Sequence, residues 1–254
     1  MTDAFVRHFR RSSRYRQSAS AVSSIGTAFL AGRLKRGLSM LLLVFLLLSV
    51  LLVSIFRFVP VPTSAFMLHT HIDDLVEERA FRQIDQRWVG RKHISKYVFA
   101  AVIASEDQLF YSHHGFDVQA IAKAYEQYLH GGKLRGASTI SQQVAKNLFL
   151  SPARNFGRKA LEIWFTLLIE MLWSKDRILE VYLNIAEFGD HLFGIEAASR
   201  HYFGVPAKQL SAPQAALLAA TLPNPIKLKA DRPSDYLYRR QNWILRQMRN
   251  LSWQ

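Results

Sequence analysis

A pair of adjacent carboxylates, Glu106 and Asp107, is the feature of this sequence best suited to acid–base chemistry. The pair follows, after Ser105, an uncharged apolar run, residues 98–104, which predicts a buried helix. Aromatic and histidine side chains come next, among them Phe110 and His113. A carboxylate at such a hydrophobic boundary is where the pKa of a general base is tuned. The sequence therefore indicates a general base at the end of this helix.

A second group of polar residues follows a glycine-rich basic loop at residues 130–136. Thr139 and Gln142 have the spacing of a capping box, which predicts the start of a helix. The free N–H groups of that N-terminus favour an anion, and Arg135 and Lys146 would add positive charge nearby. The alternative is purely structural, with glycines for a flexible loop and then a capped helix.

A third group lies on a predicted helix that begins after Ser151-Pro152 and extends to about residue 173. Arg158 and Glu162 are one turn apart, so an ordinary ion pair worth about 0.2–0.5 kcal/mol would account for them. Arg158 with Lys159 also makes a good clamp for a diphosphate. The two interpretations are compatible, because the ion pair would hold the clamp in position.

Taken together, these motifs resemble those of the peptidoglycan glycosyltransferases, which polymerise cell-wall glycan from lipid-linked precursors. The signature Glu-Asp-x-x-Phe-x-x-His-x-Gly is matched at every fixed position from Glu106 to Gly115. The Gly–Ser-Thr–Gln-Gln combination at 136–143 and the block at 175–189 match further motifs. The resemblance covers about residues 63–225 and implies the fold, the reaction and the role of each matching residue.

The resemblance implies that Glu106 is the general base and Glu162 the second catalytic acid. It implies that substrate and diphosphate are bound by Ser138, Thr139, Gln142, Gln143, Lys146, Arg158, Lys159 and Arg135. It assigns the organisation of the site to Asp107, Phe110, His113, Gly115, Glu180 and Asn184. It also implies a divalent cation, Mg²⁺ or Mn²⁺, held by Glu162.

The reaction that the resemblance implies joins lipid II units into a β-1,4-linked glycan with inversion at the donor anomeric centre. The lipid diphosphate leaves as an anion, which needs charge neutralisation, and the acceptor hydroxyl needs a base as it attacks. Two alternatives stay open: a membrane-anchored lytic enzyme of lysozyme-like fold, and a non-catalytic scaffold for cell-wall synthesis or division proteins. A lytic enzyme would not need the basic clamp.

The charge of the chain, formally +14, is concentrated near its N-terminus. Residues 1–36 hold eight Lys or Arg against one acid, whereas the remainder holds 25 bases and 18 acids. This distribution argues against a nucleic-acid surface and indicates a membrane instead. The chain has no cysteine, which excludes disulfides and cysteine-ligated metals.

The uncharged stretch at residues 37–56 predicts a transmembrane helix of about 30 Å. Positive charge precedes it, so we expect the N-terminus in the cytoplasm and the following domain on the outer face of the cytoplasmic (inner) membrane. A cleaved signal peptide fits less well, because the run is too long and Thr63-Ser64-Ala65 is a poor cleavage site. The expected organisation is a basic tail (1–36), a membrane anchor (37–56), a spacer (57–62) and a catalytic domain (63–254).

The domain is predicted to be all-α, because no run of alternating polarity indicates a strand. Helices are expected over residues 73–88, 95–105, 116–129, 139–148, 151–173, 175–187, 194–203, 211–221 and 233–251. The resemblance implies a lysozyme-like helical domain with a small membrane-proximal lobe. Because the sequence stops at Gln254 and offers no Ser-x-x-Lys nucleophile, we expect the monofunctional form, without a transpeptidase domain.

Overall fold

The computed structural model describes residues 32–132, 138–153 and 155–251, which belong to two compact units, 1–52 and 53–254. In the first unit, the described residues belong to one apolar helix, Gly32–Phe56, which continues into the second unit. By length and composition this helix can cross a membrane, and it contains the predicted anchor, 37–56.

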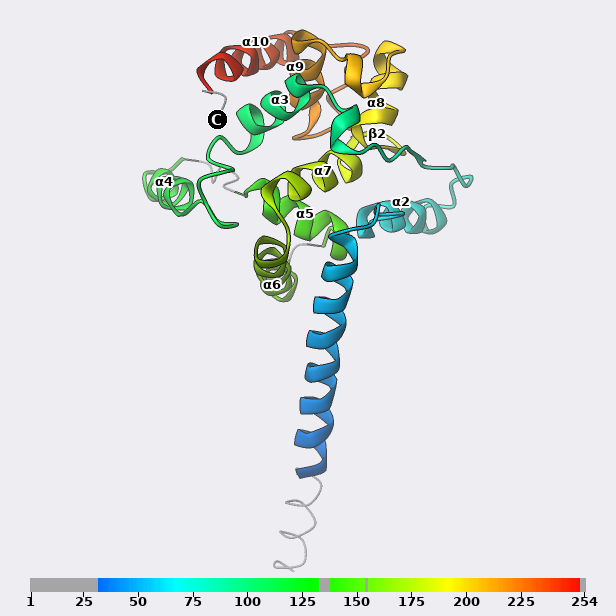
Figure 1. Ribbon diagram of the computed structural model, residues 1–254, viewed down its shortest axis with the longest axis vertical. Helices are drawn as coiled ribbons and strands as arrows, with labels where there is room; N and C mark the ends of the chain where they lie inside the picture. Colours follow the sequence, from blue (N-terminus) through cyan, green and yellow to red (C-terminus); the bar gives the residue numbers. More distant parts are fainter. Residues whose placement is uncertain (1–31, 133–137, 154, 252–254) are drawn as a thin grey trace, which may run out of the picture. The chain divides into compact units, whose positions relative to one another are not determined.

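The second unit is helical, which confirms the predicted fold class (Figure 1). Its α-helices are α2 (Ala65–Val76), α3 (Lys96–Glu106), α4 (Val118–Leu129), α5 (Ile140–Phe149), α6 (Phe156–Leu172), α7 (Lys175–Ile185), α8 (Ile195–Phe203), α9 (Ala212–Thr221) and α10 (Asp235–Asn250). Two short 3₁₀ helices cover Arg91–His93 and Ala207–Gln209. Side chains of Ser, Thr, Asp or Asn cap most of the α-helices by accepting a backbone hydrogen bond.

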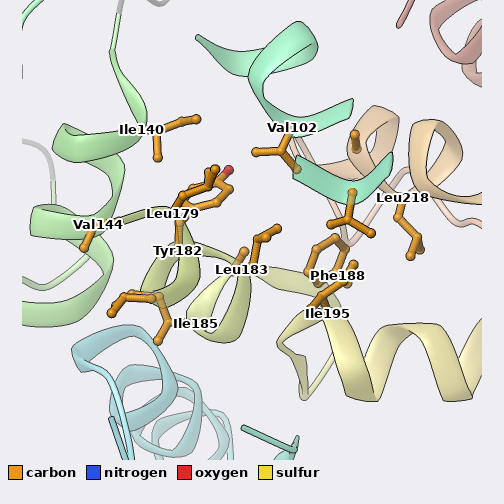
Figure 2. Packing of buried hydrophobic residues seen from close by; sticks show 14 of the residues in the cluster. Val102, Ile140, Val144, Leu179, Tyr182, Leu183, Ile185, Phe188, Ile195 and Leu218 are labelled. Atoms are coloured by element: carbon orange, nitrogen blue, oxygen red, sulfur yellow. The ribbon is translucent and has the colours of Figure 1, made fainter. Parts of the chain in front are cut away.

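Helix α7 is the centre of the core and lies between α5 and α6 on one side and α3 and α9 on the other (Figure 1). Most of its residues are buried, including Leu179, Tyr182 and Leu183. Figure 2 shows these side chains packed with apolar residues of α3, α5, α8 and α9. The predicted capping boxes, at Thr139 and at Ser211, both form and start α5 and α9.

A small sheet joins two segments that are far apart in the sequence. Strand β1 (Asp85–Gln86) pairs in parallel with β3 (Leu192–Phe193), which pairs antiparallel with β2 (Glu187–Gly189). The expected helix over 73–88 is therefore wrong. Helix α2 starts earlier, at the Ser64 cap, and ends at Val76, and the strand that follows depends on pairing with a distant hairpin.

The start of α6 also differs from the prediction. Ser151 does not cap this helix; Asn155 does, with its side chain accepting from the backbone N–H of Arg158 at 2.8 Å. The helix therefore begins at Phe156, one turn later than the Ser-Pro pair suggests. Because Asn155 fixes the first turn, it also fixes the positions from which the side chains of Arg158 and Lys159 project.

Candidate active site

Glu106 is the last residue of α3, and its carboxylate is held from one side only. Oε2 accepts a hydrogen bond of 3.0 Å from Nε2 of Gln143 on α5, whose own Oε1 accepts from the hydroxyl of Tyr182 on α7 at 3.1 Å. Oε1 is buried without a hydrogen-bond partner among the described residues, and a guanidinium nitrogen of Arg240 lies 3.7 Å away. Burial raises the pKa of Glu106 above its usual range, against the opposing effects of Gln143 and Arg240.

Asp107 ties the turn after α3 to the start of α5. It accepts a 3.0 Å hydrogen bond from the backbone N–H of Ile140 and bonds of 2.9 and 3.0 Å from Nε2 of His113. Nδ1 of His113 accepts from the backbone N–H of Gly115 at 3.1 Å, so the ring carries its donated proton on Nε2. Burial raises the pKa of Asp107, and these hydrogen bonds oppose the rise. Three of the predicted organising residues, Asp107, His113 and Gly115, therefore form one connected turn.

The capping box of α5 completes this framework. Gln142 Oε1 accepts from the backbone N–H of Thr139 at 3.0 Å, and the Thr139 hydroxyl donates to the carbonyl of Gly115 at 2.7 Å. The same threonine oxygen accepts from the backbone N–H of Gln142 at 3.2 Å. Both residues are buried, so their immediate function is to position the N-terminus of α5.

Glu162 lies on α6 and has only 3% of its surface exposed, with each oxygen paired to a cation. Oε2 accepts from Nη1 of Arg158 at 2.6 Å, and Oε1 accepts from Nζ of Lys159. The predicted ion pair is thus present, with a second basic residue added to it. A buried carboxylate between two cations fixes the directions in which both basic side chains point.

Two cavities border this framework, and Ser138 lines both. The larger, about 320 Å³, is basic and polar, with Lys146, Arg158, Lys159 and Glu162 in its wall. Gln142, Gln143, Phe66 and Pro152 complete this wall. The smaller, about 240 Å³, is lined by Glu106, Asp107, Asp117 and Trp243 together with residues of α3, of α4 and of the segment just before α5. Glu106, whose pKa is raised, therefore lines one cavity, and the cluster of cations lines the neighbouring cavity.

Besides His113 and Gly115 in the turn after α3, three of the described site residues that the sequence predicted lie outside both cavity walls. Phe110 is fully buried in the core and stacks beneath Nζ of Lys175 at 4.7 Å. Asn184 binds the backbone of Val89 through both ends of its amide, at 2.8 and 2.9 Å. Glu180 accepts from the backbone N–H of Arg91 at 3.3 Å. All three support the structure around the site. Arg135 lies outside the described residues.

Sequence reasoning missed several residues that reach the site. Tyr182 orients Gln143, and α10 brings Arg240 and Trp243 to Glu106 and its cavity. Glu170 accepts from the hydroxyl of Ser141 and from Lys175, at 2.8 Å in the second case, and packs against Gly115. The one-turn spacing of Arg240 and Trp243 was a signal for a shared helix face, but nothing local connects that face to Glu106.

The divalent cation implied by the resemblance does not fit the side chains seen here. Of the described residues in the wall of the larger cavity, Glu162 is the one carboxylate, and Arg158 and Lys159 are paired to both of its oxygens. Among the residues that the structure describes, no group of three or more His, Cys, Asp or Glu side chains is placed to hold a metal. Mg²⁺ prefers several oxygen ligands in octahedral geometry, which these side chains do not offer.

Comparison with known proteins agrees with this geometry. The family model described as transglycosylase matches residues 73–249. A biosynthetic peptidoglycan transglycosylase of Chromohalobacter salexigens is 54% identical over 221 residues, covering 86% of this chain and 94% of the relative. Proteins of the same name from Pasteurella multocida and Haemophilus influenzae are each 54% identical, over 84% and 79% of this chain and 87% and 82% of their own lengths.

Proposed function

This chain belongs to the transglycosylase family and is a peptidoglycan glycosyltransferase, and we propose that it uses the two neighbouring cavities to extend glycan from lipid II. The observation that carries the mechanism is the separation of charge between the cavities. A carboxylate of raised pKa opens onto the smaller one, and a cluster of cations lines the larger one. Transfer of a sugar from a lipid diphosphate to a sugar hydroxyl needs a base and a cluster of cations next to each other.

In the proposed reaction, Glu106 acts on the acceptor. Its Oε1 takes the proton of the acceptor hydroxyl, while Gln143 holds Oε2 and so fixes the plane of the carboxylate. The hydroxyl oxygen forms a bond to the anomeric carbon of the donor sugar as the bond from that carbon to the diphosphate breaks. Attack from the face opposite the leaving group inverts the anomeric centre and yields the β-1,4 linkage.

The basic wall of the larger cavity receives the leaving diphosphate. Lys146, Arg158 and Lys159 bring positive charge to it, so the departing anion needs no proton. Glu162 acts by holding Arg158 and Lys159 in one geometry, because both of its oxygens are paired to them. Ser138 lines both cavities, so the reacting carbon would lie beside it.

The apolar helix suits an enzyme whose substrates are lipid-linked. We propose that Gly32–Phe56 crosses the inner membrane with the basic N-terminal tail in the cytoplasm and the catalytic domain outside. Confinement of enzyme and lipid II to one bilayer raises their effective concentration. The bilayer and the growing glycan are then its constant partners, and division or elongation proteins are candidates for further ones.

Incubation of the purified full-length protein with labelled lipid II in detergent tests this function. We expect a ladder or long polymer that lysozyme digests to small fragments, and no release of fragments from finished peptidoglycan. Unchanged lipid II, from protein shown to be folded by circular dichroism, would contradict the proposal. Degradation of finished peptidoglycan with no extension would favour the lytic alternative.

A further inference from the structure

Two buried polar atoms beside the proposed base have no hydrogen-bond partner among the described residues. One is Oε1 of Glu106, and the other is Nε of Arg240 on α10. A second nitrogen of the same guanidinium, Nη2, lies 3.7 Å from Oε1. This distance suits an ion pair but is too long for a hydrogen bond. Both side chains are largely enclosed, with 13% and 24% of their surfaces exposed.

The two atoms are close enough for one oxygen, lying to the side of the line that joins them, to contact both. Hydrogen bonds to an oxygen are about 2.8–2.9 Å long, so one oxygen can lie within reach of two groups that are 3.7 Å apart. Such an oxygen must donate to the carboxylate and accept from the guanidinium, which is what a hydroxyl group does. Gln143 already occupies the other oxygen of Glu106, so Oε1 is the one left for this contact.

The pair lies next to the cavity where an acceptor would enter, because residues on both sides of it line that cavity. Glu106 lines the smaller cavity, and so does Trp243, which lies about one turn beyond Arg240 on the same helix. Contacts of α10 with α3 and α9 hold this helix against the end of α3. The guanidinium is therefore carried by a packed helix, so that its position is fixed before a substrate binds.

We propose that Arg240 is a catalytic residue that binds the oxygen of the acceptor hydroxyl while Glu106 removes its proton. This inference rests on the proposed function and adds the group that stabilises the attacking oxygen. The O–H bond breaks toward Oε1 of Glu106, and the oxygen's electron pair forms the bond to the anomeric carbon. Arg240 keeps its protons throughout and offsets the negative charge that develops on that oxygen.

The same arrangement makes the basicity of Glu106 depend on Arg240. The carboxylate is faced by Asp107 from the turn after α3, by Tyr182 from α7 through Gln143, and by Arg240 from α10. Asp117, at the start of α4, lines the same cavity. Arg240 lowers the pKa of Glu106 and so opposes the effect of burial. Removal of Arg240 therefore raises this pKa, and the acid limb of the pH–rate profile moves to higher pH.

The test compares Arg240→Gln with Arg239→Gln in the full-length protein, using lipid II polymerisation measured across pH. Arg239 is the matched control, because it is the neighbouring arginine and its side chain is exposed. We expect Arg240→Gln to lower kcat on the order of 10²–10³-fold, as for loss of one donor to a developing oxyanion. We also expect its acid limb to move to higher pH and Arg240→Lys to recover part of the rate. Arg239→Gln should keep the wild-type profile.

A double variant separates a shared chemical step from a general loss of structure. If both groups act on one hydroxyl, Glu106→Gln with Arg240→Gln should be no slower than Glu106→Gln alone. A wild-type kcat and pH profile in Arg240→Gln, with an active wild-type enzyme, would overturn this inference and leave the proposed function standing. An inactive wild-type enzyme would instead contradict the proposed function. If Arg240→Gln does not fold, wild-type kcat in Arg240→Lys overturns the inference, because a lysine lacks the planar fork.

Discussion

Gly115 offers a prediction in which the structure sets the size of the effect. Its φ of +89° lies in the region that favours glycine, and an added Cβ would lie 2.9 Å from Cγ2 of Thr166 and 3.0 Å from Cγ of Glu170. Its N–H and carbonyl also bind His113 and Thr139, which hold the turn after Glu106. The change Gly115→Ala therefore strains the backbone, crowds α6 and disturbs the turn beside the base.

Two contributions destabilise Gly115→Ala, and an effect on the unfolded chain opposes them. A non-glycine residue in the left-handed region costs about 1–2 kcal/mol, and forcing an extra methyl group into a packed site costs about 1–3 kcal/mol. The reduced entropy of the unfolded chain returns about 0.4–1 kcal/mol. We therefore expect Gly115→Ala to lower the free energy of unfolding by about 2–4 kcal/mol.

Two other glycines supply matched controls for this measurement. Gly204 has a φ of +69° but open space around its Cβ position, so Gly204→Ala should show the backbone cost alone, about 1 kcal/mol. Gly90 has φ −69° and open space, so Gly90→Ala should be neutral or slightly stabilising. Denaturant unfolding in detergent, followed by tryptophan fluorescence, compares the three. Equal losses for Gly115→Ala and Gly204→Ala would refute the close packing against α6.

Three further predictions concern the diphosphate clamp, the base and the membrane anchor. Glu162→Gln should lower the polymerisation rate at least about tenfold by releasing Arg158 and Lys159, since hydrogen bonds to charged groups contribute about 1.5–3 kcal/mol each. Turnover near wild type would show that Glu162 has no function in the site. Tyr182→Phe frees Gln143, whose hydrogen bond lowers the pKa of Glu106, so the acid limb of the pH–rate profile should move to higher pH; an unchanged limb would contradict that orienting role. An alkaline phosphatase fused to the C-terminus should be active on cells, whereas activity of a cytoplasmic reporter there would overturn the topology.

Local sequence patterns predicted most of the framework of the site correctly. The apolar run before Glu106 became α3, and the spacing of Thr139 and Gln142 became the capping box of α5. The one-turn spacing of Arg158 and Glu162 became a buried ion pair. Each of these features is decided within four or five residues of chain, where helical geometry and capping chemistry are dominant.

The features that sequence reasoning missed depend on contacts between distant segments. The strand at Asp85–Gln86 forms because a hairpin more than a hundred residues later pairs with it, and no local alternation marks it. The contact of Arg240 with Glu106 depends on how α10 packs across α3, and so does the place of Trp243 in the cavity wall. Such pairings follow from tertiary packing, which propensity and spacing do not encode.

The central claim, that Glu106 is the base for glycan extension, is tested most directly by one comparison. Purified full-length wild type and Glu106→Gln are incubated with labelled lipid II at equal concentration, and the products are resolved by size. We expect long polymer from the wild type and a rate on the order of 10²–10⁴-fold lower from Glu106→Gln, with circular dichroism unchanged. A folded Glu106→Gln protein that keeps more than about a tenth of the wild-type rate would contradict the assignment, because loss of a general base costs more than that.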